Sequence, residues 1–246
     1  AMSRRQRQMC IRDSGYVVEW RSINAADYGM PQRRRRVFIL AYLSGTELHE
    51  NLSRSDPLIY LRKDGVLANS FQIKQPMLLS CPSFKLKKNI SDDLADITLQ
   101  FNNGKGSNDD SPFKNCGIMR NGECFTFNSE PKYSGPKMCL EDVLLSAKEI
   151  PTSFMLDAND IVREKGWIYQ KGAKSEERKG TDGFTYNYAE GPMNFPDPLN
   201  SPSRTIITGE GGAGASRFKH VVVFKPTKKQ KEEFGLNSKP VSYTHL

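Results

Sequence analysis

The sequence predicts an α/β chain, in which the last strands of a covered sheet are followed by a longer, mixed and mainly β region. Two observations indicate this class. The apolar run at residues 37–42 is short and partly β-branched, and it follows a turn marked by Gly29 and Pro31, which is typical of a strand buried in a sheet. Farther along the chain, short strand-like segments alternate with turns, and few stretches are suited to a helix.

The middle of the chain contains one clear hairpin signal. Residues 116–127 are strand-like on both sides of Asn121 and Gly122, a dipeptide that favours the positive φ angles of a tight turn. Residues 104–111 form a polar stretch without core-forming side chains, and Asp157 is a candidate helix cap. Helices are expected at residues 141–147, 158–165 and 227–234.

The most informative stretch is a run of four arginines at residues 33–36, which leads directly into the predicted strand. If the chain is extended from Gln32 onward, then Gln32, Arg34 and Arg36 share one face of the strand. Each guanidinium offers a planar fork of donors that keeps its charge, which suits phosphate oxygens and base carbonyls. A bare run of arginines is more often a solvated patch or a nuclear localisation signal. Here the run is joined to a turn and a strand, which favours a binding role.

Residues 24–40, NAADYGMPQRRRRVFIL, resemble the N-A-x-D-Y-G-x-P-Q-x-R-x-R block of the DNA cytosine-5 methyltransferases. The resemblance implies that the strand belongs to a Rossmann-like sheet of an S-adenosylmethionine-dependent methyltransferase. It also implies that Arg36 contacts a cytosine flipped out of the DNA and that Arg34 supports nearby phosphate and backbone. Gln32 would hold the turn or a neighbouring hydrogen bond.

A second block, PLNSPSRTIITGEGG at residues 198–212, resembles the next motif of the same family and stands in the right order. In bacterial members these two motifs bracket the target-recognition region, which reads the DNA sequence. Arg204 and Thr208 are accordingly expected to anchor the recognition domain and a phosphate.

The glycines of the second block have two interpretations. Gly209, Gly211 and Gly214 formally match a dinucleotide-binding fingerprint, but a basic loop and a strand follow them instead of a helix. We therefore expect a loop whose small residues let the backbone approach DNA closely. The DNA contacts expected here are Gly211, Gly212 and Arg217.

The recognition region itself contains a stretch with DNA-binding composition. Residues 171–188 interleave glycines, cations and aromatic side chains, as in a loop along a groove where cations meet phosphates and polar groups reach base edges. An equally weighted alternative is a solvated surface loop with Phe184, Tyr186 and Tyr188 on one inward strand face. The candidate DNA contacts are Lys171, Lys174, Arg178 and Lys179.

Composition agrees with double-stranded DNA as the partner. The net charge of +8 favours polyanions, although the first fourteen residues contribute +3 of it.

Five cysteines without a C-x-x-C pair indicate neither a disulfide framework nor a metal site, and fit a reducing cytoplasm. Cys116 and Cys124 are expected as small, buried strand residues. No apolar run has membrane-spanning length, so no membrane partner is expected. We expect a monomer.

The resemblance also implies residues that this sequence does not contain. The family's nucleophilic cysteine lies in Pro-Cys-Gln, its glutamate in Glu-Asn-Val and its cofactor loop in Phe-x-Gly-x-Gly, and none of these occurs here. The resemblance covers residues 15–226, so the chain is expected to be the C-terminal portion of a bacterial-type enzyme. It would be inactive alone, with S-adenosylmethionine bound mostly outside this span.

The expected organisation and the rival functions follow from these resemblances. Rivals are a tRNA-modifying relative, which usually has a smaller insert, and a non-catalytic DNA-binding protein of the same descent. Whether a cognate restriction endonuclease accompanies the protein stays open. The expected parts are a non-native leader (1–14), the end of the catalytic domain (15–42), the target-recognition domain (43–200), the joining motif (201–226), and a helix with a non-native tail (227–246).

Overall fold

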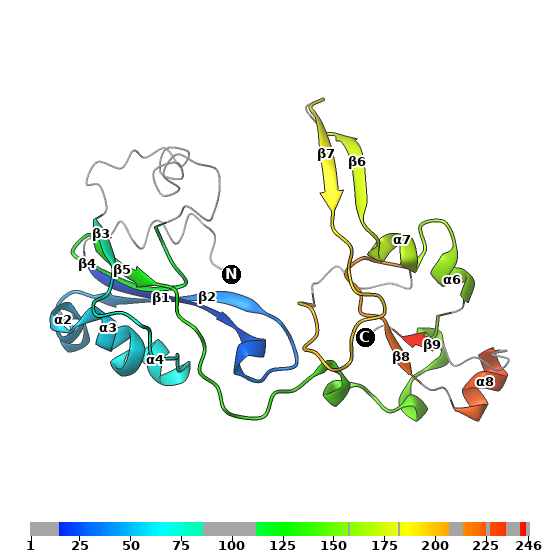
Figure 1. Cartoon of the computed structure of the whole chain (residues 1–246), viewed down its shortest axis with the longest axis horizontal. Coiled ribbons are helices and arrows are strands. Elements are labelled where there is room, and N and C mark those ends of the chain that lie inside the picture. Colours follow the sequence, from blue (N-terminus) through cyan, green and yellow to red (C-terminus); the bar gives the residue numbers. More distant parts are fainter. Residues whose placement is uncertain are drawn as a thin grey trace. The chain divides into compact units, whose positions relative to one another are not determined.

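The computed structural model describes residues 15–85, 112–156, 158–181, 183–206, 214–224, 227–234 and 242–244. The chain divides into two compact units (Figure 1). The first contains Ala1–Gly29 and Arg34–Pro136, and the second contains Met30–Arg33 and Lys137–Leu246. The chain therefore enters the second unit for four residues in the middle of the arginine-rich motif.

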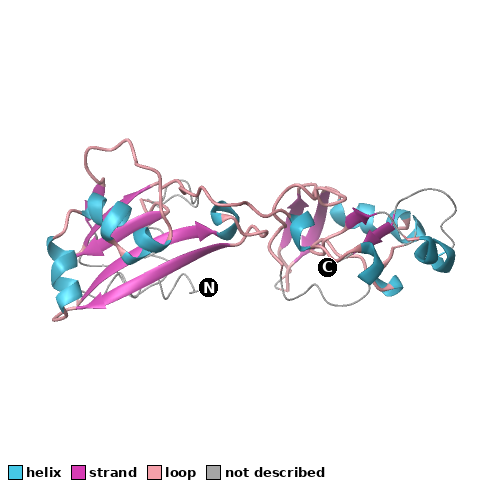
Figure 2. Ribbon diagram, turned by 90° about the horizontal axis from the view of Figure 1, so that it is seen from below, coloured by secondary structure: helices cyan, strands magenta, loops and turns pink. Residues whose placement is uncertain are grey.

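The first unit is built on a five-stranded sheet with the order β2-β1-β4-β5-β3, in which every pairing is antiparallel (Figure 2). A mixed α/β structure is confirmed, whereas the Rossmann-like arrangement of the sheet stays a prediction. The strands are β1 (Tyr16–Asn24), β2 (Arg35–Leu43), β3 (Ser83–Lys85), β4 (Cys116–Arg120) and β5 (Glu123–Phe127).

The predicted hairpin is confirmed as β4 and β5. Cys116 lies opposite Phe127, and the turn residues Asn121 and Gly122 have φ angles of 51° and 73°. Cys116 and Cys124 are buried, as expected for small strand residues. Local turn chemistry therefore sets the register of this pair.

Short helices follow β2 along the chain and contribute to a core on one face of the sheet. Leu52 and Leu61 pack with Val17 and Ile118 in this core. The sequence interpretation did not include these helices, because each is too short to show a sustained helical period. They are α2 (Glu47–Arg54), α3 (Pro57–Ile59), the π-helix η2 (Tyr60–Asp64) and α4 (Val66–Ser70).

Strand β1 is buried along most of its length, as is β4. Its Val17 belongs to the core with the helices, whereas Val18 and Trp20 belong to a second core on the opposite face. Strand β2 pairs only with β1 among the described strands, and its Val37 and Phe38 are 37% and 42% exposed. The prediction of a strand at residues 37–42 is confirmed, but the prediction that it is buried is wrong, because β2 lies at the sheet edge.

A buried polar cluster ties the short helices to β1. The Arg21 guanidinium donates to the main-chain oxygens of Leu67 at 3.0 Å and Phe71 at 2.7 Å, and also to that of Leu61. These carbonyls lie at or near the ends of short helices, and that of Leu67 also accepts from the Phe71 N–H at 2.9 Å. On the same face, Glu19 accepts hydrogen bonds from the hydroxyls of Tyr42 and Tyr60, both at 3.2 Å. Burial raises the pKa of Glu19 above its ordinary value.

The second unit consists of short elements. Its core includes Leu156, Trp167 and Val221. Among the described residues, no helix of either unit is long and apolar enough to cross a membrane. The elements are η4 (Leu140–Val143), η5 (Ala147–Glu149), η6 (Thr152–Phe154), α6 (Ala158–Val162), α7 (Trp167–Lys171), β6 (Lys174–Lys179), β7 (Thr185–Glu190), β8 (Val222–Phe224), α8 (Lys228–Phe234) and β9 (Ser242–Thr244).

The helix predictions for this unit have mixed outcomes. The helix expected at residues 227–234 is confirmed as α8, whereas the one expected at residues 141–147 is wrong, because two separate 3-10 turns occupy that region. The helix expected at residues 158–165 ends earlier, at Val162, and Lys165 has a positive φ of 58° that a helix does not allow. Asp157 and residues 104–111 lie outside the described residues.

Candidate nucleic-acid interface

The arginine-rich motif begins with a tight turn that the sequence specifies locally. Residues Ala25–Tyr28 form a 3-10 turn, η1, and Gly29 ends it with a φ of 88°. A Cβ at Gly29 would lie 2.6 Å from both the Tyr133 hydroxyl and the Pro136 carbonyl oxygen, so only glycine fits. The turn fixes where the following arginines begin.

The chain next pairs with the second motif, 170 residues away in the sequence. The Ser203 N–H donates to the Pro31 carbonyl at 2.7 Å, and the Arg33 N–H donates to the Ser203 carbonyl at 2.8 Å. Gln32 lies opposite Ser203 in a parallel bridge, and the Thr205 hydroxyl donates to the Arg33 carbonyl. The two motifs identified from the sequence are therefore joined by main-chain hydrogen bonds.

This pairing corrects the predicted arrangement of the motif. The extended strand does not run from Gln32, because β2 begins at Arg35 and Gln32 lies in the bridge to Ser203. Gln32 and Arg36 therefore belong to different units and do not form one comb of side chains along a strand. The main-chain groups of Pro31 and Arg33, on either side of Gln32, hold this segment to Ser203, and a role for the Gln32 side chain stays a prediction.

Arg34 and Arg36 stand at the entrance of β2. Arg36 lies opposite Ile23 and is partly exposed, and the interaction shown for its guanidinium is a 2.7 Å hydrogen bond to the carbonyl of Arg35. Arg34 is exposed, and its main-chain oxygen accepts from the Ala25 N–H at 3.1 Å. Within the described residues neither guanidinium has a carboxylate partner. Both can therefore donate to an external anion or base.

Arg204 is placed very differently. Its Nε and Nη2 donate to the two carboxylate oxygens of Asp197 at 2.8 and 3.1 Å, and Nη1 and Nη2 donate to the carbonyls of Phe218 and Lys219 at 3.1 and 3.0 Å. Four of its five N–H groups are thus used inside the protein. Burial alone would raise the pKa of Asp197, but hydrogen bonds from Arg204 and the Val221 N–H hold that pKa below its ordinary value. Arg204 anchors the fold of this unit.

Two further predicted contacts are also internal. Lys171 is buried at the end of α7, and its ammonium donates to the carbonyls of Arg217 at 2.8 Å and of Lys219. The Arg217 guanidinium donates to the carbonyl of Gly172 at 3.3 Å and lies 3.3 Å from the Glu190 carboxylate. His220 is fully buried. Lys171 and Arg217 thus bond main-chain carbonyls within this unit.

The stretch expected as a groove-binding loop is a β-hairpin. Strands β6 and β7 pair in register from Lys174 opposite Glu190 to Lys179 opposite Thr185. The prediction of a loop is wrong for these residues, because the two strands satisfy each other's main-chain groups. The alternative of an inward aromatic face is also wrong, because Phe184 is 68% exposed and Tyr186 is 42% exposed.

The cations of this hairpin differ in availability. The Lys174 ammonium lies 3.7 Å from the Glu190 carboxylate and 4.4 Å from the centre of the Tyr169 ring, so it is not in a flexible loop. Arg178 lies 3.6 Å over the Tyr188 ring, and Lys179 is exposed near the hairpin tip. Thr208, Gly211 and Gly212 lie outside the described residues.

Sequence reasoning missed the polar pair Glu19 and Arg21. A signal was present, because strand-like alternation over Tyr16–Asn24 places both residues on one face of an otherwise apolar strand. A buried acid and base at this spacing indicate a structural network.

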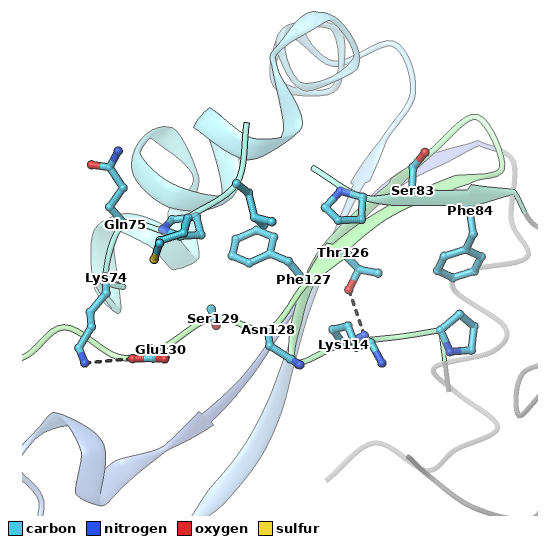
Figure 3. A pocket seen from close by; sticks show the side chains of 15 residues that line it. Lys74, Gln75, Ser83, Phe84, Lys114, Thr126, Phe127, Asn128, Ser129 and Glu130 are labelled. Carbon is cyan, nitrogen blue, oxygen red and sulfur yellow. Dashed lines mark hydrogen bonds and ion pairs between the residues drawn. The ribbon is translucent and has the colours of Figure 1, made fainter. Parts of the chain in front are cut away.

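A cavity of about 850 Å³ opens on the first unit beside β3 and β5 (Figure 3). Its wall includes Phe84, Phe127, Thr126 and Lys114, and the Lys74 ammonium forms a 3.0 Å ion pair with Glu130 at one end. None of the predicted site residues lines it. Its one carboxylate is already paired, so the cavity offers no acidic group to a bound nucleoside.

The fold and site define an α/β protein with an exposed arginine, Arg34, and a partly exposed one, Arg36, at a strand entrance, and with a projecting polar hairpin. The family model for C-5 cytosine-specific DNA methylases matches residues 8–132, and the chain belongs to this family. It is 34% identical over 208 residues to the type II methyltransferase M.Sau3AI of Staphylococcus aureus, covering 84% of this chain and 46% of that protein.

A second relative matches over a short stretch. The type II methyltransferase M.MthTI of Methanothermobacter thermautotrophicus is 60% identical over 30 residues, which are 12% of this chain and 9% of that protein. The chain thus spans less than half the length of these relatives. No solved structure matches.

Proposed function

We propose that this chain is the C-terminal part of a DNA cytosine-5 methyltransferase and that it contacts the flipped cytosine and reads the surrounding DNA. Family membership supports the reaction, and the names of the two relatives, both type II methyltransferases, agree with it. The long segment between the two motifs favours DNA over tRNA. The observation that carries the proposal is the position of Arg36, whose guanidinium lies at the entrance of β2 without a carboxylate partner among the described residues.

The proposed role of Arg36 follows from base flipping. The target carbon of cytosine is inaccessible within a stacked duplex, so the base must leave the helix before it reacts. A guanidinium can then donate to the base carbonyl oxygen. Arg34, one residue before β2, would hold the neighbouring phosphate or backbone. Because the contact forms only with the extruded base, its energy contributes mainly to the chemical step.

We assign the other predicted DNA contacts by their surroundings. Lys171, Arg204 and Arg217 satisfy carbonyls and carboxylates of the second unit, so their proposed role is to position the motif loop. Lys174 and Arg178 stiffen the hairpin. Lys179 is exposed and is our candidate for a phosphate contact.

We propose that the nucleophile and the cofactor site of the reaction lie elsewhere in the full-length enzyme. A cytosine-5 methyltransferase needs a cysteine thiolate, but burial raises the pKa of the Cys81 and Cys124 thiols to about 12 and also raises that of Cys116. The cavity beside β5 has one carboxylate, Glu130, which is paired with Lys74. These surroundings support our assignment of both the nucleophile and the S-adenosylmethionine site to the rest of the full-length enzyme.

Single-turnover methylation of duplex DNA by the full-length enzyme tests the role of Arg36. Arg36→Ala should lower the rate at saturating DNA by about a hundredfold or more, the typical cost of a lost transition-state donor. Arg35→Ala is the matched control, because Arg35 is the preceding residue of β2 and its side chain points to the opposite face. Methylation by Arg36→Ala at the parental rate would show that the contact is assigned to the wrong residue.

A further inference from the structure

The β6–β7 hairpin has two chemically different faces. In Figure 1 it extends away from α7 and the rest of its unit. Directly opposite residues of an antiparallel pair share a face, and alternate residues of each strand point to opposite sides. We call one side the closed face, formed by Lys174, Glu176, Arg178, Tyr186, Tyr188 and Glu190. The other is the open face, formed by Ser175, Glu177, Lys179, Thr185, Asn187 and Ala189.

The charged groups of the closed face are engaged with one another and with aromatic rings. The Glu176 carboxylate accepts from the Tyr169 hydroxyl at 2.8 Å and lies 3.3 Å from the Arg178 guanidinium. Arg178 covers the Tyr188 ring, and Lys174 is paired with Glu190. Such contacts hold side chains in place and leave few donors for a ligand. The closed face therefore stiffens the ribbon.

The open face has the opposite character. All six of its residues are exposed, and the one interaction shown for their side chains is a 3.1 Å hydrogen bond between the Ser175 hydroxyl and the Asn187 amide oxygen. Its side chains offer a carboxylate, an ammonium, a carboxamide, hydroxyls and a methyl group. These are the groups that distinguish base pairs in the major groove of DNA.

We propose that the open face lies in the major groove and that Glu177 and Asn187 read base edges there. This inference rests on the proposed function, which supplies duplex DNA as the ligand. The major groove admits a two-stranded β-ribbon. Glu177 and Asn187 are directly opposite each other, so they present an acceptor-only group beside a donor–acceptor group. The carboxylate suits the amino group of cytosine, and the carboxamide suits adenine.

The strand spacing fixes which open-face residues share a base pair. Side chains on one face recur every two residues, about 6.8 Å along the ribbon, which corresponds to about two base-pair steps at ~3.4 Å each. Ser175 and Ala189 form the row on the inner side of Glu177 and Asn187, and Lys179 and Thr185 form the outer row. We assign the outer row, next to the hairpin tip, to the phosphate backbone, because its lysine is a mobile point charge.

The open face differs in net charge from a surface that binds phosphates without regard to sequence. The open face carries one acid, Glu177, and one base, Lys179, so it has no net charge to attract a polyanion. A carboxylate in a DNA interface is repelled by phosphates and is useful where it accepts from a base amino group. The position of Glu177 inside the face therefore favours base reading over simple attraction.

Selection of bound sequences from a duplex library with a randomised core tests the proposal, using the full-length protein. Glu177→Gln and Asn187→Ala should each relax the base preference at one or two adjacent positions, by about tenfold to a hundredfold for the affected base pair. Glu176→Gln is the matched control, because it makes the same chemical change at the neighbouring residue on the closed face. It should lower the melting temperature of the hairpin unit and leave the selected sequences unchanged.

The outcomes separate this inference from the proposed function. Relaxed preference in both open-face variants, with parental melting temperature, supports base reading by this face. If both variants select the same sequences as the parent, the open face does not read bases, and the proposed function stands. If the parental protein neither binds nor methylates duplex DNA, the proposed function fails, and this inference fails with it.

Discussion

Arg204 and Asp197 form a bidentate ion pair in the second unit, with Nε–Oδ1 and Nη2–Oδ2 distances of 2.8 and 3.1 Å. The same carboxylate accepts from the Val221 N–H at 2.9 Å, so the pair also fixes the start of β8. Arg204 lies in the second sequence block, residues 198–212, and Asp197 directly precedes that block, so this arginine has a structural role. Its charge holds protein carbonyls and a carboxylate together.

Arg204→Ala should destabilise the second unit strongly. Removal of one partner leaves a buried carboxylate without its counter-charge, which costs about 3 kcal/mol or more. Arg178→Ala is the control, because Arg178 and its partner Glu176 have side chains 44% and 40% exposed, so the loss of this surface pair should change the unfolding midpoint far less. Urea unfolding followed by Trp167 fluorescence measures both variants. Equal midpoints for the two would contradict the structural role of Arg204.

The same pair makes stability dependent on pH in the acid range. The pKa of Asp197 is lower in the folded chain than its ordinary value of 3.8. The unfolded chain therefore binds the proton more readily, and the stability from this carboxylate is fully present above about pH 4 and is lost as the pH falls through the lower folded value. Asp197→Asn should flatten the stability profile below about pH 4. Urea midpoints between about pH 2.5 and pH 6 test this, and a parental slope in the variant would count against it.

Gly117→Ala should destabilise the first unit through overpacking. A Cβ at this position would lie 2.1 Å from the Trp20 ring, which covers the glycine from the neighbouring strand. Overpacking of this kind costs about 1–3 kcal/mol. Gly191→Ala is the control, because nothing lies within 4 Å of its added Cβ. Thermal unfolding monitored by Trp20 fluorescence should show a lower midpoint for Gly117→Ala alone.

Duplex binding by the 246-residue chain should depend steeply on salt. With about four phosphate contacts, affinity should fall by about two decades between about 50 and 200 mM salt. Lys179→Ala should reduce the slope of log affinity against log salt by about one, because its exposed ammonium neutralises a phosphate. Lys74→Ala should leave the slope unchanged, since the Lys74 ammonium is already paired with the Glu130 carboxylate at 3.0 Å. Salt-independent affinity of the parent would refute the interface.

The 246-residue chain should not methylate DNA by itself. Of the four described cysteines, Cys81, Cys116 and Cys124 are held as thiols by burial, which raises the pKa of each. Incubation with tritiated S-adenosylmethionine and mixed-sequence duplex should give no incorporation above background. The full-length enzyme serves as the positive control. Sustained incorporation by the shorter chain would overturn our assignment of nucleophile and cofactor to the rest of the full-length enzyme.

Local chemistry determined several features from the sequence by itself. The hairpin at Asn121 and Gly122 and the strand after the arginines followed from turn residues and apolar runs, which act over a few neighbouring residues. The order and composition of the two motifs pointed to the family that the family model then showed. The hairpin and the strand could be predicted from a single sequence, because the interactions that determine them act between neighbouring residues.

The tertiary structure alone decided which charges are available. Arg36 and Arg204 look alike in the sequence, yet one is left without a carboxylate partner among the described residues and the other is enclosed by Asp197 and two carbonyls. Lys171 and Lys179 differ in the same way, because one lies at a buried helix end and the other near an exposed hairpin tip. The pairing of Gln32 with Ser203 likewise joins segments 170 residues apart. Whether a charged side chain is exposed to solvent or bonded to a buried carbonyl depends on packing between distant segments. Such packing cannot be predicted from the residues that neighbour the charge in the sequence.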